Sequence, residues 1–228
     1  MFAPALGTSG RLTTELILRS PQYMNACSEY EIDLRGNKIS AIENLGGTEN
    51  QFDSIDLSDN EIVKLEGFPL LPKLKTLLLN NNRVMRISKN LEASIPNVET
   101  LVLTGNRLTN ITDIQNLSGL KNLKRLVVIG NGIAKLPGYR LRIIHALPQL
   151  KMLDFQKVKL KERQKAESSG GQGMGPEEDA AMEDAPQDAT MEAPAKKKPV
   201  DVTAIKAAIA SATTIEEVQK LEAALLNA

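Results

Sequence analysis

The chain has 228 residues, of which 42% are hydrophobic but only 3% aromatic, and it contains no Trp. This length accommodates one domain with a tail or two small domains, and the core must consist of aliphatic side chains. A single cysteine, Cys27, excludes an internal disulfide framework and fits a reducing compartment, and we expect its thiol to pack beneath the N-terminal cap.

The formal net charge of zero conceals a segregation of charge along the chain. Residues 1–70 contain 11 acids and 5 bases, whereas residues 71–165 contain 5 acids and 18 bases. Residues 166–195 contain 8 acids and no base. This segregation indicates that different parts of the molecule meet partners of different charge.

The first residues predict a cap rather than a targeting segment. Residues 1–10 lack the basic-then-apolar order of a signal peptide, and no apolar run approaches the ~18 residues of a membrane span. We therefore expect a cytosolic or nuclear protein with no membrane association. Residues 12–20 predict a helix that begins at Thr13 or Thr14 and ends before Pro21.

The template L-x-x-L-x-L-x-x-N-x-L then recurs five times, with Glu29 in place of the first apolar residue of the first copy. Its asparagines are Asn37, Asn60, Asn82, Asn106 and Asn131. The steps between them are 23, 22, 24 and 25 residues, within the range of leucine-rich repeats. The sequence therefore predicts an α/β fold, a leucine-rich-repeat solenoid with a parallel β-sheet on its concave face and short helical or 3₁₀ turns on its convex face.

The residue types of the repeat have physical reasons. Alternating leucines such as Leu77 and Leu79 place every second side chain of a short strand inward. The asparagine that follows each strand can donate to and accept from buried backbone groups, so the stacked asparagines form a ladder that satisfies otherwise unpaired peptides. Apolar residues every third position after the asparagine, such as Ile39 and Ile42, suit tight turns on the convex side.

The far end of the solenoid also predicts a cap. Residues 139–148 indicate a longer helix, and Leu150, Leu153 and Phe155 repeat the strand pattern, with Val158 where an asparagine would stand. We expect Phe155 to be buried and the repeat domain to span residues 1–165.

The remainder predicts a tail of two parts. Residues 166–200 are rich in Gly, Ser, Pro and acids and indicate a disordered acidic linker, in which Lys196, Lys197 and Lys198 form a weak candidate for a nuclear-import signal. Residues 201–228 predict two short helices, roughly 202–211 and 215–226, with a capping box of Thr214 and Glu217 between them. Such short helices need a docking partner, or they form a self-contained hairpin.

Nothing in the sequence points to catalysis. His145 is the only histidine and has no cysteine near it, and no phosphate loop, dinucleotide fingerprint or nucleophile elbow occurs. We predict that the chain is not an enzyme and holds no cofactor and no metal.

The positions that flank the inward strand residues predict a protein-binding surface on the concave face. Exposed aliphatic residues aligned across adjacent strands are unusual on a solvated sheet, and they favour a partner helix with an apolar centre and a basic edge. Strand-forming residues tolerated on a half-covered sheet are the alternative. The predicted contacts are an acidic and polar group of Asp33, Arg35, Asp56 and Ser58, and a mainly aliphatic group of Leu78, Asn80, Val102, Thr104, Val127 and Ile129.

Basic residues gather around the last two strands and predict contact with nucleic-acid phosphates, with a plain solvated cap as the alternative. Because Phe155 is expected to be buried, no aromatic residue remains for stacking, and contact with the backbone of a stem is favoured over base reading. The predicted RNA contacts are Lys124, Arg125, Lys151, Lys157, Lys159, Lys161 and Arg163.

Three stretches carry a resemblance: residues 30–39 (YEIDLRGNKI), 67–83 (GFPLLPKLKTLLLNNNR) and 153–163 (LDFQKVKLKER). The chain resembles the A-prime family of the U2 small nuclear ribonucleoprotein over about residues 12–167, and again over 201–225. The run DFQKVKLKER is the most discriminating part.

The resemblance implies a nuclear scaffold of pre-mRNA splicing. It implies that an RNA-recognition-motif partner, B-double-prime, is held in the concave face through a helix, and that the pair binds a stem-loop near the 3′ end of U2 small nuclear RNA. Other spliceosomal proteins are candidate partners of the C-terminal helices. The alternatives are a leucine-rich-repeat regulatory subunit of a type-1 protein phosphatase, although such a subunit should have more than five repeats, or another nuclear interaction adaptor.

Overall fold

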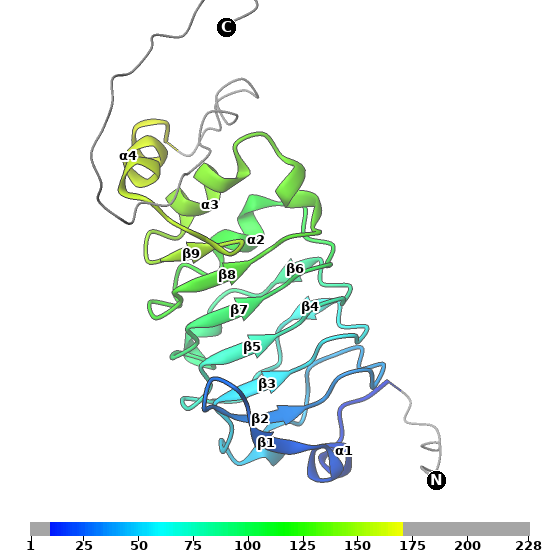
Figure 1. Ribbon diagram of the computed structural model, residues 1–228. Coiled ribbons are helices and arrows are strands. Elements are labelled where there is room, and N and C mark those ends of the chain that lie inside the picture. The colour runs from blue at the N-terminus through cyan, green and yellow to red at the C-terminus, as the bar shows by residue number, and fades with distance from the viewer. Residues whose placement is uncertain (1–9, 171–228) are drawn as a thin grey trace, which may run out of the picture. The chain divides into compact units, whose positions relative to one another are not determined.

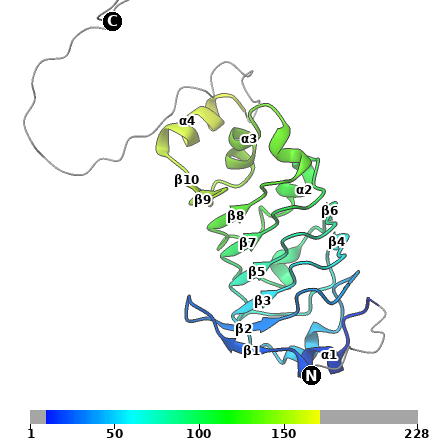
Figure 2. The same ribbon diagram turned by 45° about the vertical axis from the view of Figure 1, so that its right-hand side comes forward.

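A computed structural model describes residues 10–170 of the chain, which form a solenoid of stacked coils (Figure 1). This confirms the predicted leucine-rich-repeat architecture. Most of the predicted linker, the three consecutive lysines and the two helices predicted within residues 201–228 lie outside the described residues. Within the described part, each coil contributes one strand to a sheet that runs the length of the solenoid (Figure 2).

The sheet has eight strands in the order β1-β2-β3-β5-β7-β8-β9-β10. Its parallel strands are β2 (Tyr30–Asp33), β3 (Ser54–Asp56), β5 (Thr76–Leu78), β7 (Thr100–Val102), β8 (Arg125–Val127) and β9 (Met152–Leu153). The edge strands β1 (Gln22–Met24) and β10 (Gln156–Lys157) each pair antiparallel with their neighbour. Hairpins therefore close both ends of the parallel sheet.

Leucine and related side chains fill the interior, as the alternation predicts. In β5, Leu77 is fully buried and pairs in register with Ile55 of β3 and Leu101 of β7. Leu79, just beyond the strand, is also fully buried. Each coil thus stacks its apolar residues on those of the next, which makes the core continuous along the solenoid.

The asparagine ladder forms as expected. The Asn82 amide donates to the carbonyl oxygens of Leu57 (2.9 Å) and Leu79 (3.2 Å) and accepts from the amide of Ile62 (3.0 Å). Asn60, Asn106 and Asn131 repeat this pattern one coil apart. Asn37 differs because it belongs to the first coil, and its amide group reaches only the carbonyl of Arg35.

The residue before each ladder asparagine has a left-handed backbone. This conformation turns the chain inward and favours Gly, Asn and Asp. The five residues are Gly36, Asp59, Asn81, Gly105 and Gly130, with φ between 52° and 76°. The residue types at this position therefore satisfy a backbone requirement of the repeat.

The other side of the coils consists of short turns and one element that the sequence did not predict. The turns are the 3₁₀ segments η1 (Leu45–Thr48), η2 (Leu91–Ala93) and η3 (Gly132–Lys135) and the short helix α2 (Ile111–Gln115). The additional element is a two-stranded parallel sheet of β4 (Lys64–Leu65) and β6 (Arg86–Ile87). It arises because two coils of nearly equal length bring extended backbone into register.

Helices cover both ends. Helix α1 (Thr14–Arg19) begins at Thr13, whose hydroxyl accepts from the amide of Leu16. Helix α3 (Tyr139–Ala146) confirms the helix predicted over residues 139–148 in the C-terminal cap of the solenoid. The expectation that Cys27 packs beneath the cap is wrong, because Cys27 lies in the turn between β1 and β2 and is exposed.

Helix α4 (Leu160–Ser168) was not predicted from the sequence, and it crosses the predicted domain boundary at residue 165. Arg140 of α3 holds this helix: its guanidinium donates to Glu162 (2.6 Å) and to the carbonyl of Leu153 (2.9 Å). Glu162 also accepts from the backbone amide of Lys159 (2.8 Å). Burial alone would raise the pKa of Glu162, but the hydrogen bonds from Arg140 and Lys159 hold that pKa below its ordinary value.

This clamp predicts a pH-dependent contribution to stability. Arg140→Met should lower the free energy of unfolding at pH 7 by about 2 kcal/mol, because it leaves a half-buried carboxylate without its partner. Since the folded pKa of Glu162 is lowered, its contribution is complete above the unfolded pKa of about 4.3 and is lost as pH falls through the folded pKa. The difference between wild type and variant in urea unfolding should therefore shrink below about pH 4.

Arg142→Met is the matched control on the same helix, because the Nε atom of Arg142 is buried without a hydrogen-bond partner. It should leave the wild-type pH dependence in place. A difference for Arg140→Met that stays constant from pH 7 to pH 3 would contradict the role of the clamp.

Candidate protein- and RNA-binding surfaces

The concave side of the sheet presents rows of side chains that follow the strand register. In the central row, Asp33 pairs with Asp56, Asp56 with Leu78, Leu78 with Val102, and Val102 with Val127. A second row, one position beyond each inward leucine, contains Arg35, Ser58, Asn80, Thr104 and Ile129, and is connected by backbone hydrogen bonds between adjacent coils. The structure thus brings together all ten predicted partner-binding residues on one face.

The N-terminal part of this face is acidic. Arg35 forms ion pairs with Asp33 (2.6 Å) and Asp56 (3.4 Å), so a single guanidinium faces two carboxylates. The hydrogen bond from Arg35 lowers the pKa of Asp33, whereas burial raises the pKa of Asp56. Next to this group, Glu31 accepts from the hydroxyls of Tyr23 (2.9 Å) and Ser54 (2.8 Å), which fixes a further carboxylate on the same side.

The middle of the face is aliphatic but unevenly accessible. Leu78 and Val102 are half-buried and Ile129 is 41% exposed, whereas Val127 is only 5% exposed. The accessible part of this region, here called the aliphatic strip, therefore consists mainly of Leu78, Val102 and Ile129.

Asp56 and Ser58 are likewise nearly buried, with exposures of 6% and 4%. Asp56 accepts from the amide of Ser58 (2.8 Å), and the Ser58 hydroxyl accepts from the side chain of Asn80 (3.0 Å). These two residues therefore position their neighbours Arg35 and Asn80 and offer little surface of their own. The strand pattern placed them on the correct face but did not reveal these local hydrogen bonds.

The predicted RNA-contacting residues fall into two groups. Lys124 forms an ion pair with Glu99 (2.7 Å), and Arg125 donates from Nε to the hydroxyl of Thr100 (2.7 Å). The hydrogen bond from Lys124 lowers the pKa of Glu99. Both basic side chains are thus held over β7 and β8, at the edge of the concave face.

The second group lies on the C-terminal cap. Lys151, Lys157, Lys159 and Lys161 are exposed around β9, β10 and the start of α4. Arg163 is different, because its guanidinium donates to the backbone carbonyls of Pro148 and Leu150 and so joins α4 to the loop between α3 and β9. We use the term basic rim for Lys124, Arg125, Lys151, Lys157, Lys159 and Lys161.

The expectation that Phe155 is buried is wrong, because its side chain is 69% exposed. Leu153 pairs with Gln156, so Asp154 and Phe155 are the two central residues of a tight hairpin turn. A turn residue projects beyond the sheet, whereas the strand pattern assumed that β9 continues to Phe155. The rim thus contains an exposed aromatic side chain that the sequence analysis had excluded.

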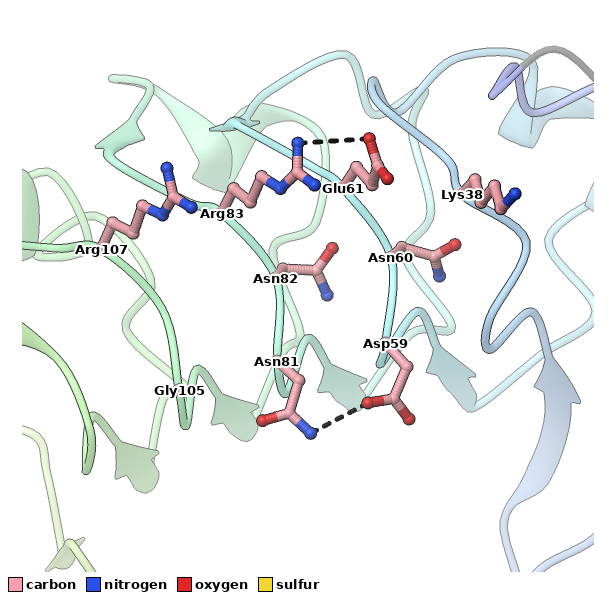
Figure 3. A pocket seen from close by; sticks show the side chains of 9 residues that line it. All are labelled: Lys38, Asp59, Asn60, Glu61, Asn81, Asn82, Arg83, Gly105 and Arg107. Atoms are coloured by element: carbon pink, nitrogen blue, oxygen red, sulfur yellow. Dashed lines mark hydrogen bonds and ion pairs between the residues drawn. The ribbon is translucent and has the colours of Figure 1, made fainter.

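A shallow depression of about 460 Å³ lies outside the concave face, on the coils that follow β2, β3, β5 and β7 (Figure 3). The ladder residues Asn60 and Asn82 form part of its lining. Two contacts join its lining residues: Arg83 contacts Glu61 at 3.3 Å, and Asn81 donates to Asp59 at 2.9 Å. These contacts are explained by the stacking of the coils.

Residues 10–170 contain no group of three or more His, Cys, Asp or Glu side chains placed to hold a metal ion. In the same part of the chain, no helix has the length and apolar character needed to cross a bilayer.

Comparison with known proteins agrees with this architecture. A family model described as leucine-rich repeat matches residues 10–176. The U2 small nuclear ribonucleoprotein A' of Arabidopsis thaliana is 49% identical over 226 residues, covering 94% of this chain and 90% of the relative. The human protein of the same name is 48% identical over 222 residues, covering 94% of this chain and 87% of the relative.

A solved structure is also similar. A chain in the crystal structure of the Drosophila melanogaster SNF/U2A' complex superposes with a TM-score of 0.68 and 50% sequence identity. The match covers 69% of this chain and 90% of the solved chain.

Proposed function

The chain belongs to the U2 small nuclear ribonucleoprotein A' family of leucine-rich-repeat proteins, and from this premise we propose that it bridges a protein partner and the U2 small nuclear RNA. The observation that carries the proposal is the adjacency of two surfaces. The aliphatic strip runs along the sheet as far as Ile129 beyond β8, and the basic rim begins at Lys124 and Arg125 of the same coil.

We infer that the concave face holds one helix of an RNA-recognition-motif protein, B-double-prime. The similar fly chain was solved as a complex with SNF, which supports a protein partner for this fold. The central row offers a helix apolar contacts at Leu78 and Val102, and the carboxylates around Arg35 suit basic residues at one edge of that helix.

The basic rim is proposed to contact the phosphates of a stem-loop in the RNA. Lys151, Lys157, Lys159 and Lys161 are exposed, whereas Asp154 and Glu162, the carboxylates nearest to them in the chain, face protein groups. The surface is therefore positive where RNA would lie, which is the main requirement for affinity to a phosphate backbone.

The wider assignment follows from the family. We propose that the chain acts in the nucleus as a non-catalytic scaffold without a cofactor, and that residues 201–228 dock on other spliceosomal proteins. The relatives' name over 94% of the chain favours this assignment over a phosphatase regulatory subunit.

The RNA contact is tested by reversing charge at the rim. The double variant Lys157→Glu and Lys159→Glu should weaken RNA binding by the partner complex, and it should flatten the dependence of log K on log salt by about 1.5–2 because two phosphate contacts are lost. Fluorescence anisotropy with the U2 stem-loop RNA at several salt concentrations measures both.

The double variant Lys64→Glu and Lys89→Glu changes the net charge equally but lies on the coils around β4 and β6. It should leave the salt slope unchanged. Equal slopes for wild type and the rim variant would place the RNA contact elsewhere.

A further inference from the structure

The turn that carries Phe155 has an unfavourable backbone. Asp154 and Phe155 have φ values of 51° and 63°, in the left-handed region. Asn or Gly adopts this conformation readily in a two-residue hairpin turn, whereas a bulky aromatic residue does so at a cost. The fold therefore accepts strain at a position where the side chain gains little burial.

The turn is held rigidly from the inside. One carboxylate oxygen of Asp154 accepts from the amide of Val128 (2.7 Å), and the other accepts from the hydroxyl of Tyr139 (3.1 Å). Arg140 donates to the carbonyl of Leu153 (2.9 Å), just before the turn. These contacts fix the backbone from which the Phe155 side chain projects into solvent. Strain of this kind is typical of binding sites.

The surroundings of the ring are cationic. Lys157 and Lys161 are exposed on β10 and α4, which directly follow the turn in the chain. The two acids nearest to the turn in the chain already have protein partners. Asp154 accepts hydrogen bonds from Val128 and Tyr139, and Glu162 forms an ion pair with Arg140. An exposed aromatic ring on a fixed turn, next in the chain to lysines, fits a nucleic-acid base with its flanking phosphates.

We propose that Phe155 stacks on an unpaired base of the RNA that binds the basic rim. The inference rests on the proposed function and extends it, because it adds a base contact to the phosphate contacts of the lysines. Every base offers a π-face, so the contact tolerates different sequences but requires a nucleotide outside the double helix. The ring would thus fix the position of the rim along the RNA.

The absence of Trp from the natural sequence permits a direct test. Phe155→Trp introduces a single tryptophan into the full chain. Its fluorescence emission is the emission of the variant complex minus that of the same complex with wild-type Phe155. Addition of U2 stem-loop RNA with its single-stranded flanks should quench this emission, and addition of the RNA-recognition-motif partner alone should leave it unchanged. An unchanged emission with RNA bound, or a change caused by the partner alone, would overturn the proposal.

Binding by a second variant separates stacking from a structural role. Phe155→Gly relieves the backbone strain, so its thermal midpoint should rise, whereas its RNA affinity should fall by about five- to a hundredfold with an unchanged salt slope. Phe155→Tyr should retain wild-type affinity. Leu160→Ala removes a side chain that is 71% exposed on the same cap and serves as the control.

The two proposals fail in different ways. If the lysine reversals flatten the salt slope but Phe155→Gly binds RNA like wild type, the stacking proposal is wrong and the proposed phosphate contacts remain. If the lysine reversals also have no effect, the proposed RNA-binding function of the rim fails as well.

Discussion

Val102→Asp should abolish binding of the RNA-recognition-motif partner while the solenoid stays folded. Val102 is half-buried in the central row, in register between Leu78 and Val127. A partner helix covering this row would bury the new carboxylate among apolar side chains without a compensating charge, at a cost of about 3 kcal/mol or more. Isothermal titration calorimetry should show at least about a hundredfold weaker binding.

Two control variants show whether the effect is local. Val102→Thr keeps the shape without a charge and should weaken binding by less than about tenfold. Val63→Asp introduces the same charge at a valine that is 41% exposed near β4, away from the concave row, and should leave binding unchanged. Wild-type affinity for Val102→Asp would show that the aliphatic strip is ordinary surface.

Asn82→Ala should lower the free energy of unfolding by about 2–4 kcal/mol, measured by urea denaturation. The Asn82 side chain is 5% exposed and is the hydrogen-bond partner of the buried amide of Ile62. It also links the carbonyls of Leu57 and Leu79 in adjacent coils. Alanine leaves the Ile62 amide unpaired in the interior, where it has no access to water.

Asn37→Ala is the matched control, because it changes the same repeat position in the first coil. Asn37 is half-buried and its amide group reaches only the carbonyl of Arg35, so the cost should stay below about 1 kcal/mol. Equal losses for the two variants would contradict the view that the ladder acts by pairing backbone groups of adjacent coils.

The repeats are predictable from sequence because the same pattern of residues recurs in every coil. Alternation of leucines fixes which side of each strand is buried, as at Leu77 and Leu79, and the asparagine requirement repeats with every coil. The N-terminal cap is predictable for a similar reason, since Thr13 is a good N-cap residue before an apolar helix. The cap is encoded within its own segment, and the ladder contacts join each repeat only to the matching positions of the next, so both follow from the sequence pattern.

Within the C-terminal cap, helix α4 and the turn at Phe155 depart from prediction because they depend on contacts that the repeat pattern does not encode. Helix α4 carries many charged residues and has no clear apolar stripe; it is held by Arg140 from a different helix. The exposure of Phe155 follows from a turn that Asp154 stabilises through Val128 and Tyr139. The low accessibility of Val127 on the concave face likewise emerges only in three dimensions.

The central claim, a bridge between a protein in the concave face and RNA at the rim, is tested most directly by affinity purification of the full chain with and without ribonuclease. Wild type should recover the RNA-recognition-motif partner in both samples and U2 small nuclear RNA only in the untreated one. Val102→Asp should lose the partner even without ribonuclease. Recovery of a phosphatase, with no small nuclear RNA in either sample, would contradict the account.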